Sequence, residues 1–449
     1  MRWKYNVLYM ILLLYTFLLF SACSFLDKGD PEILGQEVIT LYSEGEFENA
    51  YKNYFSNSWK DANTPEEMES EWTDHTSEMG DFIGVNELIS KESVNSSYVV
   101  EVAVEYTDII FDVRLIMNKD YKITNLHMDQ GIVNAVMPDS IIEEEVKIGE
   151  GTEFELMGTL TLPNNSDVSF PVAVIVHGSG PIDRDGTAYS YKAYRDIAWG
   201  LAGRGVGVLR YDKRTYVYGG LMHEQGLTSI TIREEVIDDA LAALDLLKND
   251  SRIDSEQLYL IGHSLGGMLA PKISLEYDNL SGMIMMAGSP RSLWDIIYDQ
   301  NINILNTGIY DEEEREILRE QLELEREKSI VLLEEAKEEK LMNETIFGLP
   351  ATYMYDLEQY KPSEIVDDLK IPMFVLQGED DFQVLKEADF NKWQSLLGEN
   401  ELATLKSYPG LNHFFIEYDG LGKGTIEEYD IPNTVDEEVI NDISQWILK

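Results

Sequence analysis

The sequence predicts an α/β protein in which a mostly parallel, doubly wound sheet carries a helical insertion and follows a small α+β domain. Three observations lead to this fold class. Short, nearly continuous apolar runs between residues 172 and 409 alternate with stretches of helical periodicity, as strands buried on both faces require. The interval 290–369 between two of these runs is longer than one helix needs. Residues 31–140 place helical patterns before strands of alternating polarity.

The first residues are predicted to direct secretion. A short positive region, Arg2 and Lys4, precedes an apolar run over residues 7–20, and small residues then lead up to Cys23. This run is short for a membrane span, so we expect a signal peptide over residues 1–22, with an uncleaved N-terminal anchor as the alternative.

Cys23 is the only cysteine, which excludes an intramolecular disulfide and a cysteine-based metal site. The sequence LLFSA before it resembles a bacterial lipobox, although Phe20 stands where leucine is usual. The resemblance implies that Cys23 is lipidated and becomes the mature N-terminus, and two acyl chains suffice for stable anchoring. We therefore expect residues 23–30 to tether a lipoprotein to the extracytoplasmic face of a bacterial membrane.

The small domain is expected over residues 31–140. Helical spacing covers residues 31–55, with a break at Gly45, and returns over 64–79. Alternating strands follow at 98–106, 109–117 and 121–128. This order resembles the cone-shaped domain of the nuclear-transport-factor type that precedes some bacterial hydrolases.

The second domain is expected over residues 145–449, beginning with two antiparallel strands within 146–163. Helical stretches over 191–205 and 232–250 separate the next apolar runs. The runs predicted as strands are 172–178, 205–212, 258–264, 282–288, 373–380 and 403–409.

The insertion over residues 290–369 has two interpretations. Its segment 311–340 contains 13 acidic and 6 basic residues with intermittent apolar positions, which predicts one or two charged helices. The simpler interpretation is a solvated helical excursion, and the functional one is a lid over a cleft. The aromatic segment 346–360 could line such a cleft or belong to a core.

The charge of the chain excludes one class of partner. There are 83 acidic and 35 basic residues, which gives a net charge of −48. Nucleic-acid binding needs clustered Lys and Arg, so the sequence argues against it and predicts a solvated acidic surface.

The motif Gly262-His263-Ser264-Leu265-Gly266 predicts a nucleophilic serine. It lies between a buried strand and a helical stretch, where a tight turn exposes the hydroxyl of Ser264. Glycines before and after the serine remove side chains that would clash at that turn. The amide of Leu265 would then point at a developing oxyanion, and His263 is expected to pack or hydrogen-bond nearby.

A serine nucleophile needs a base and an acid that orients the base. His413 is the only histidine after Ser264, and it lies in a loop that follows the last predicted strand. Glu379, Asp380 and Asp381 follow the preceding strand and are the candidate acids.

A second oxyanion donor is expected in the loop after the strand 172–178. Glycines there let backbone amides approach a substrate carbonyl, and we favour the amide of Ser179, with that of Gly178 as the alternative. Ser179 is not expected to be a rival nucleophile, because it does not lie in a matching strand-to-helix turn. His177 is not expected to be the base, because it precedes the serine in the wrong part of the sheet.

Residues 145–449 resemble the α/β-hydrolase family, in particular its dienelactone-hydrolase and prolyl-oligopeptidase-like esterases. The resemblance selects Asp381 as the acid from the layout G-x-x-D-x-x-V, with Asp380 as runner-up. It also matches Asp183, Arg184 and Asp185 to a family segment near the oxyanion loop, and we interpret them as a structural ion-pair network, with substrate contacts as the alternative. The family's segments occur in order at 177–186, 209–214, 262–267, 376–384 and 409–415.

These observations predict a serine hydrolase that cleaves small carboxylic esters through Ser264, His413 and Asp381, without a metal or cofactor. A peptidase or acylaminoacyl hydrolase of the same fold is the first alternative, because fold does not separate these reactions. A surface-anchored binding protein on an inactive scaffold is the second.

Overall fold

The computed structural model describes residues 30–92, 97–164, 169–224, 230–335 and 341–449. The predicted signal peptide, Cys23 and all of the tether except Asp30 lie outside the described residues. The chain divides into two compact units, Met1–Ala135 and Val136–Lys449, which are taken in turn. Among the described residues, no helix combines the length and apolarity needed to cross a membrane.

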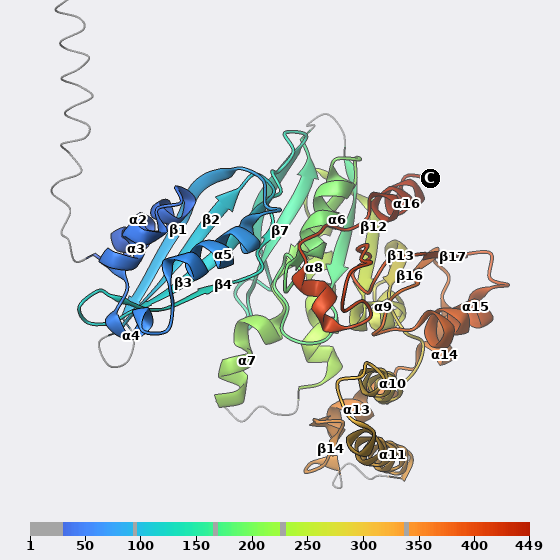
Figure 1. Cartoon of the computed structure of the whole chain (residues 1–449). Coiled ribbons are helices and arrows are strands. Elements are labelled where there is room, and N and C mark those ends of the chain that lie inside the picture. The colour runs from blue at the N-terminus through green and yellow to red at the C-terminus, as the bar shows by residue number, and fades with distance from the viewer. Residues whose placement is uncertain (1–29, 93–96, 165–168, 225–229, 336–340) are drawn as a thin grey trace, which may run out of the picture. The chain divides into compact units, whose positions relative to one another are not determined.

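The first unit is an antiparallel sheet of order β1-β2-β3-β4, with β5 paired to β3 and helices packed on one face (Figure 1). Its elements are α2 (Pro31–Ser43), α3 (Phe47–Tyr54), α4 (Asn57–Lys60), α5 (Pro65–Thr76), β1 (Phe82–Glu92), β2 (Tyr98–Tyr106), β3 (Ile109–Met117), β4 (Ile123–Met128) and β5 (Ile132–Val133).

Local signals explain most of this unit. Asp30 caps α2 through a hydrogen bond from the amide of Glu32, and Thr64 and Glu67 form a reciprocal capping box at α5. Inward-facing positions of β2 are buried, as its alternation predicts. The sequence-based prediction missed β1, because register irregularities between Phe82 and Leu88 break the alternation in its first half.

The second unit is built on one sheet of order β17-β16-β13-β12-β8-β11-β7-β6. The pairs β6–β7 and β7–β11 are antiparallel, and the other pairs in this order are parallel. The strands are β6 (Ile141–Ile148), β7 (Leu156–Pro163), β8 (Phe170–Val176), β11 (Gly207–Tyr211), β12 (Ile253–His263), β13 (Leu280–Met286), β16 (Met373–Gly378) and β17 (Ala403–Tyr408).

Both faces of this sheet are covered by helices. In β8, Val172 and Val174 belong to one apolar cluster, whereas Ala173 and Ile175 belong to the cluster on the opposite face. α6 (Ala193–Ala202) and α16 (Glu437–Ile447) contribute to the second cluster; α8 (Asp238–Lys248), α9 (Leu265–Glu276) and α15 (Asn391–Leu397) contribute to the first. The predicted fold class, a mostly parallel doubly wound sheet after a small α+β domain, is confirmed.

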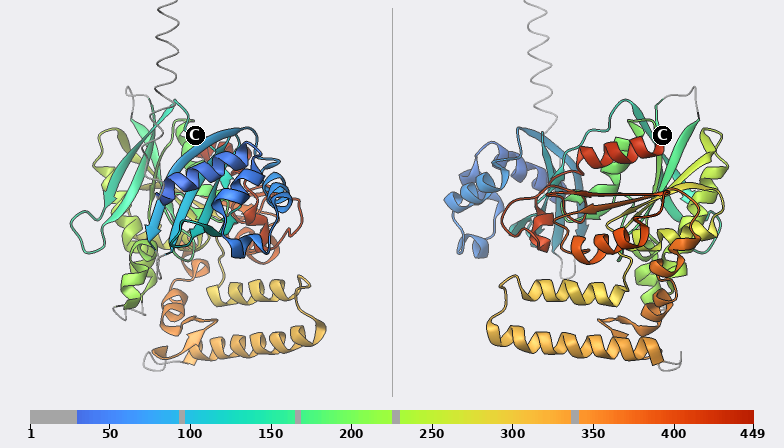
Figure 2. Two further views of the ribbon diagram at one scale, coloured as in Figure 1. Left: turned by 60° about the vertical axis from the view of Figure 1, so that its left-hand side comes forward. Right: turned by 90° about the vertical axis from the view of Figure 1, so that its right-hand side faces the viewer.

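The insertion, called the cap below, leaves the sheet after β13 and returns before β16. α10 and α11 form a helical hairpin beside the sheet (Figure 2), and Leu341, Ile346, Ala351 and Met354 form a small separate core. Its elements are α10 (Leu293–Leu305), α11 (Glu312–Glu335), the hairpin of β14 (Thr345–Ile346) and β15 (Leu349–Pro350), α13 (Ala351–Glu358) and α14 (Pro362–Ile365).

Shorter elements complete the unit between these landmarks. They are β9 (Thr187–Ala188), β10 (Tyr191–Lys192), α7 (Arg214–Glu224), π-helical turns at Arg233–Ile237 and Lys386–Phe390, and 3₁₀ turns at Val366–Asp368 and Ile426–Asp430.

Candidate active site

Ser264 lies on a strained turn between the end of β12 and the start of α9. Its φ is 54° and its ψ is −115°, a backbone conformation that residues other than glycine rarely adopt. A Cβ atom at Gly262 would lie 2.2 Å from the carbonyl oxygen of Gly266, and one at Gly266 would lie 2.2 Å from that of Val176. The motif therefore needs glycine at both positions for the strand, turn and helix to approach each other.

Asp381 and His413 meet at the ends of neighbouring parallel strands. Asp381 follows β16 and His413 follows β17, and Nδ1 of the histidine lies 2.8 Å from Oδ2 of the aspartate. Both side chains are buried. The runner-up Asp380 instead pairs with Lys423 at 2.7 Å, where both side chains are at least a third exposed.

Fixed donors hold the carboxylate of Asp381. Its Oδ1 accepts hydrogen bonds from the backbone amides of Gln383 at 2.8 Å and Val384 at 2.9 Å. Its Oδ2 accepts one from Nε2 of Gln377 at 2.9 Å. These donors hold the carboxylate in one orientation toward His413.

A buried network links the loops around Ser264. Tyr194 accepts a hydrogen bond from the amide of Gly178 at 3.2 Å and lies 3.1 Å from Nδ1 of His263. Nε2 of His263 lies 3.0 Å from the carbonyl oxygen of His413, so this nitrogen carries the proton and donates it. Burial, and then the nearby His413, lowers the pKa of His263 to about 3, so its ring is neutral.

His263 directly precedes Ser264 and hydrogen-bonds to the backbone of His413, so this network fixes the position of His413 relative to the serine. Within the described chain, Oγ of Ser264 and the ring of His413 share no hydrogen bond; such contacts commonly tighten when substrate binds. The hydrogen-bonding role expected of His263 is confirmed. Sequence reasoning missed Tyr194, because nothing in its sequence context separates it from a core tyrosine.

Two backbone amides beside Ser264 are free to bind an oxyanion. Within the described residues, the amides of Leu265 and Ser179 donate to no protein acceptor, and Leu265 begins α9, whose N-terminus carries partial positive charge. The amide of Gly178, the alternative donor, is engaged by Tyr194. A Cβ atom at Gly178 would lie 3.1 Å from that of Ser264, so this loop passes close to the serine.

A cavity of about 160 Å³ opens at Ser264, between the sheet and the cap. Among the residues that the structure describes, none with a charged side chain lines it, although the chain as a whole is strongly acidic. The residues that line it are Ser179, Ser264, Leu265, Met268, Ser289, Leu293, Ile296, Ile297, Gln300, Leu349, Gln383 and Val384. The cap contributes part of this lining, from α10 and from the β14–β15 hairpin, and the lid interpretation stays a prediction.

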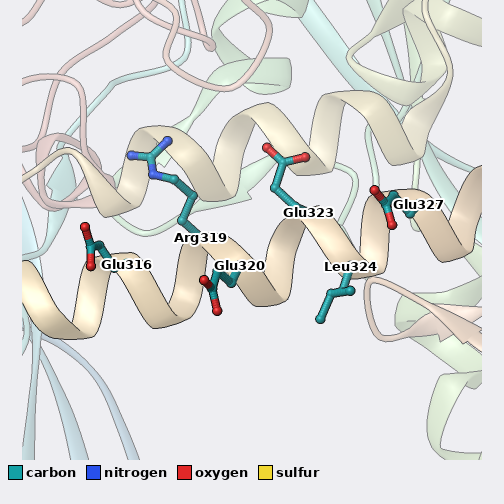
Figure 3. Close-up of a pocket in the computed structure, with 6 residues that line it drawn as sticks. All are labelled: Glu316, Arg319, Glu320, Glu323, Leu324 and Glu327. Carbon is teal, nitrogen blue, oxygen red and sulfur yellow. The ribbon is translucent and has the colours of Figure 1, made fainter.

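A larger hollow of about 540 Å³ lies on α11 and contains none of the predicted catalytic residues (Figure 3). Its side chains are those of Glu316, Arg319, Glu320, Glu323, Leu324 and Glu327. Carboxylates along one exposed helix are typical of a solvated surface. Among the described residues, no three His, Cys, Asp or Glu side chains gather as a metal site.

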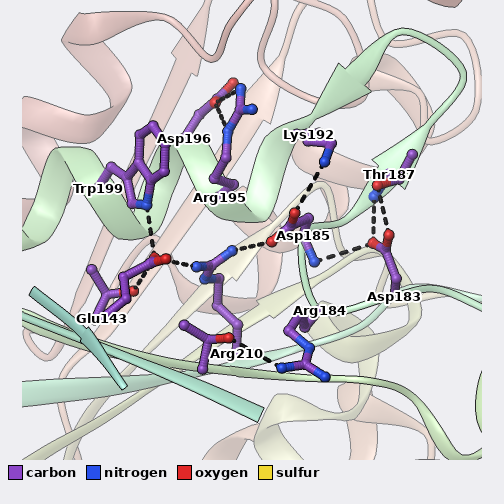
Figure 4. Close-up of polar contacts among 12 residues, drawn as sticks. Glu143, Asp183, Arg184, Asp185, Thr187, Lys192, Arg195, Asp196, Trp199 and Arg210 are labelled. Atoms are coloured by element: carbon purple, nitrogen blue, oxygen red, sulfur yellow. Dashed lines mark hydrogen bonds and ion pairs between the residues drawn. The ribbon is translucent and has the colours of Figure 1, made fainter. Parts of the chain in front are cut away.

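The network expected at residues 183–185 is confirmed (Figure 4). Nη2 of Arg184 lies 2.7 Å from Oδ2 of Asp212, and Asp185 pairs with Arg210 and, at 3.2 Å, with Lys192. Asp183 accepts hydrogen bonds from backbone amides of its own loop. These contacts brace the loop that follows β8 and supply no side chain to the cavity at Ser264.

Comparison with known families matches two separate parts of the chain, one inside each compact unit. Residues 173–419 match the α/β hydrolase family, and residues 35–126 match a family described as a protein of unknown function, DUF3887. The predicted likeness of the first unit to the nuclear-transport-factor type stays a prediction.

A curated relative is Esterase EstD of Thermotoga maritima, which is 35% identical over 335 residues, covering 74% of this chain and 75% of that protein. Among solved structures, Est1E from Butyrivibrio proteoclasticus is 16% identical with a TM-score of 0.42, covering 68% of this chain and 98% of that one. A putative dienelactone hydrolase from Klebsiella pneumoniae is 18% identical with a TM-score of 0.38, covering 69% and 98%.

Proposed function

The chain belongs to the α/β-hydrolase family, and on that premise we propose that it is a carboxylesterase that works through Ser264, His413 and Asp381. One observation carries the proposal: a buried Asp381–His413 pair, 2.8 Å apart, stands at the same edge of the sheet as the strained turn that presents Ser264. The relative EstD, which is named an esterase, supports the reaction class.

The proposed reaction has two halves. Oγ of Ser264 attacks the ester carbonyl while Nε2 of His413 takes the hydroxyl proton, and the tetrahedral oxyanion is held by the amides of Leu265 and Ser179. Collapse expels the alcohol, which takes the proton from His413 and leaves an acyl-serine. Water then attacks that ester by the same route, releasing the acid and restoring the serine. Asp381 stabilises the imidazolium formed in each half.

The cavity supports an ester rather than a peptide substrate. Its described lining contains no charged group that would pair with the terminal ammonium or carboxylate of a peptide. An apolar cavity of about 150 Å³ holds one benzene molecule, and the cavity here measures about 160 Å³. We therefore expect an uncharged acyl group of about six carbons or fewer.

The test compares residues 24–449 with the Ser264→Ala variant on p-nitrophenyl esters of increasing acyl length. The proposal predicts hydrolysis that prefers short chains and is lost in the variant. Ester hydrolysis that survives the substitution would remove Ser264 as the nucleophile. A folded protein without activity on any of the esters would favour the peptidase or the binding-protein alternative.

We further infer from the lipobox-like sequence that the enzyme is anchored to the outer face of a bacterial membrane through Cys23. Cells grown with radiolabelled palmitate should label the full-length chain and leave Cys23→Ser unlabelled. Equal labelling of both would contradict the anchor.

A further inference from the structure

The peptide group between Gly178 and Ser179 is held by a buried lysine. Lys213, which follows β11, is only 2% exposed, and its Nζ donates to the carbonyl oxygen of Gly178 at 2.8 Å. An ammonium group loses much solvation when it is buried and is retained only where its partners compensate. The contact with Gly178 is therefore specific and not an incidental surface hydrogen bond.

Glu235 supplies most of that compensation. Its Oε1 lies 2.5 Å from Nζ of Lys213, and its side chain is only 8% exposed. Burial lowers the pKa of Lys213, and Glu235 opposes this shift by charge and hydrogen bonding. Tyr353 of the cap is also buried, and after burial itself the charge of Glu235 contributes to raising the pKa of its hydroxyl, so the pair lies against the cap.

The geometry of a peptide group connects this lysine to the oxyanion. A trans peptide is planar, and its C=O and N–H point in opposite directions. The carbonyl of Gly178 is directed at Lys213, so the amide of Ser179 in the same plane is directed away from it. Ser179 lies on the wall of the cavity that also contains Ser264.

We propose that Lys213 is a positioning residue for ester hydrolysis, which aims and polarises the Ser179 amide toward the oxyanion by holding the Gly178 carbonyl. This inference rests on the proposed esterase function. The amide of Gly178 is held by Tyr194 at 3.2 Å, so the residue is fixed at its nitrogen as well as its oxygen. A hydrogen bond to the carbonyl of an amide strengthens its N–H as a donor, because successive hydrogen bonds polarise one another.

The neighbouring Arg214 provides a matched control. It is the first residue of α7 and forms a second buried ion pair, with Asp239; the exposed fractions of the two side chains are 12% and 6%. In the described part of the chain, the guanidinium of Arg214 donates to Asp239 and not to the Gly178–Ser179 peptide. Loss of either cation leaves a buried carboxylate without its partner, so the two substitutions should destabilise the fold in the same way.

The experiment measures kcat, KM and inhibition by an alkyl trifluoromethyl ketone, which forms a tetrahedral oxyanion adduct with a nucleophilic serine. The variants are Lys213→Met, Lys213→Met with Glu235→Gln, and Arg214→Met. The double variant leaves no unpaired buried charge, so it reports on the site if the single variant fails to fold.

Removal of Lys213 should lower kcat about tenfold to hundredfold with little change in KM, somewhat less than the loss of an oxyanion donor itself. The inhibition constant of the trifluoromethyl ketone should rise by the same factor. Arg214→Met should lower the thermal midpoint and leave kcat and the inhibition constant unchanged. Wild-type kcat and inhibition in the folded double variant would overturn the inference alone. A wild-type protein without ester hydrolysis would overturn the proposed function, and the inference with it.

Discussion

The core around Ser264 and the cap that faces it are held by different forces. In the core, three protein donors fix the carboxylate of Asp381, and close backbone packing at Gly262 and Gly266 holds the strained turn of Ser264. The cap is attached by side chains: Arg291 at its base pairs with Asp389, and Nε2 of Gln300 donates to the carbonyl oxygen of Gln383 at 3.1 Å. The positions of Ser264 and Asp381 are therefore set by the backbone of the core. One wall of the cavity instead depends on how the cap is attached to that core.

The largest expected effect is on the core. Asp381→Asn should lower kcat about 10⁴-fold, because an amide stabilises the wrong imidazole tautomer and no longer stabilises the imidazolium. An unchanged KM and an unchanged thermal midpoint would show that Asp381→Asn is still folded. Asp380→Asn is the control, since its side chain pairs with Lys423 at the surface. A loss of activity in Asp380→Asn that Asp381→Asn does not share would reverse the assignment of the acid.

The next effect concerns the attachment of the cap. Arg291 contacts the fully buried Asp389 at 2.7 Å and also Asp295 and Asp299. Arg291→Gln should lower the free energy of unfolding by about 3–5 kcal/mol, because it leaves a buried carboxylate uncompensated. Urea unfolding measures the change. Arg326→Gln, which removes pairs at 4.0 Å from a side chain that is 41% exposed, should cost less than about 1 kcal/mol. Equal losses of unfolding free energy in the two variants would show that Arg291 attaches the cap no more strongly than a surface ion pair does.

A smaller effect is expected on acyl-chain preference. Ile297 of α10 lines the cavity, so Ile297→Trp should narrow it and shift kcat/KM toward shorter acyl chains by about 10–200-fold. The same ester ladder measures the shift. Leu324→Trp places the same ring in the hollow on α11, where Leu324 is 65% exposed, and should leave the preference unchanged. An equal shift in acyl-chain preference for Leu324→Trp and Ile297→Trp would show that the acyl group does not bind in the cavity at Ser264.

The smallest effect is a pH dependence of stability in the core. Burial, and then the charge of Lys213, lowers the pKa of His177 to about 3 from its ordinary 6.5. Between these values the unfolded chain binds a proton that the folded chain does not. His177 therefore contributes its full stability above pH 6.5 and loses it as the pH falls toward 3.

His177→Asn should reduce the slope of unfolding free energy against pH by up to about 1.4 kcal/mol per pH unit in that window. Denaturant unfolding between pH 4 and 7 measures the slope. Parallel curves for the variant and the wild type would show that His177 is charged in the folded protein.

Sequence patterns predicted the core better than the cap for a physical reason. Parallel strands buried on both faces are nearly continuous apolar runs, and the turn at Ser264 admits only glycine at two positions, so both leave a clear pattern. In the cap, a charged segment predicted the helix α11, yet Leu349, which lines the cavity, lies in a two-residue strand that propensity does not mark. Tyr194 and Lys213 act through contacts with Gly178, and such long-range contacts leave no local periodicity.

The most direct test of the central claim is to locate the reactive serine. Diethyl p-nitrophenyl phosphate phosphorylates the serine of a working Ser–His–Asp set, and peptide mass mapping identifies the residue that carries the diethyl phosphate. The account predicts one adduct, on Ser264, which forms in step with the loss of esterase activity and is absent from Asp381→Asn over the same time. A stoichiometric adduct on Ser179 or another residue, with Ser264 unmodified, would contradict it.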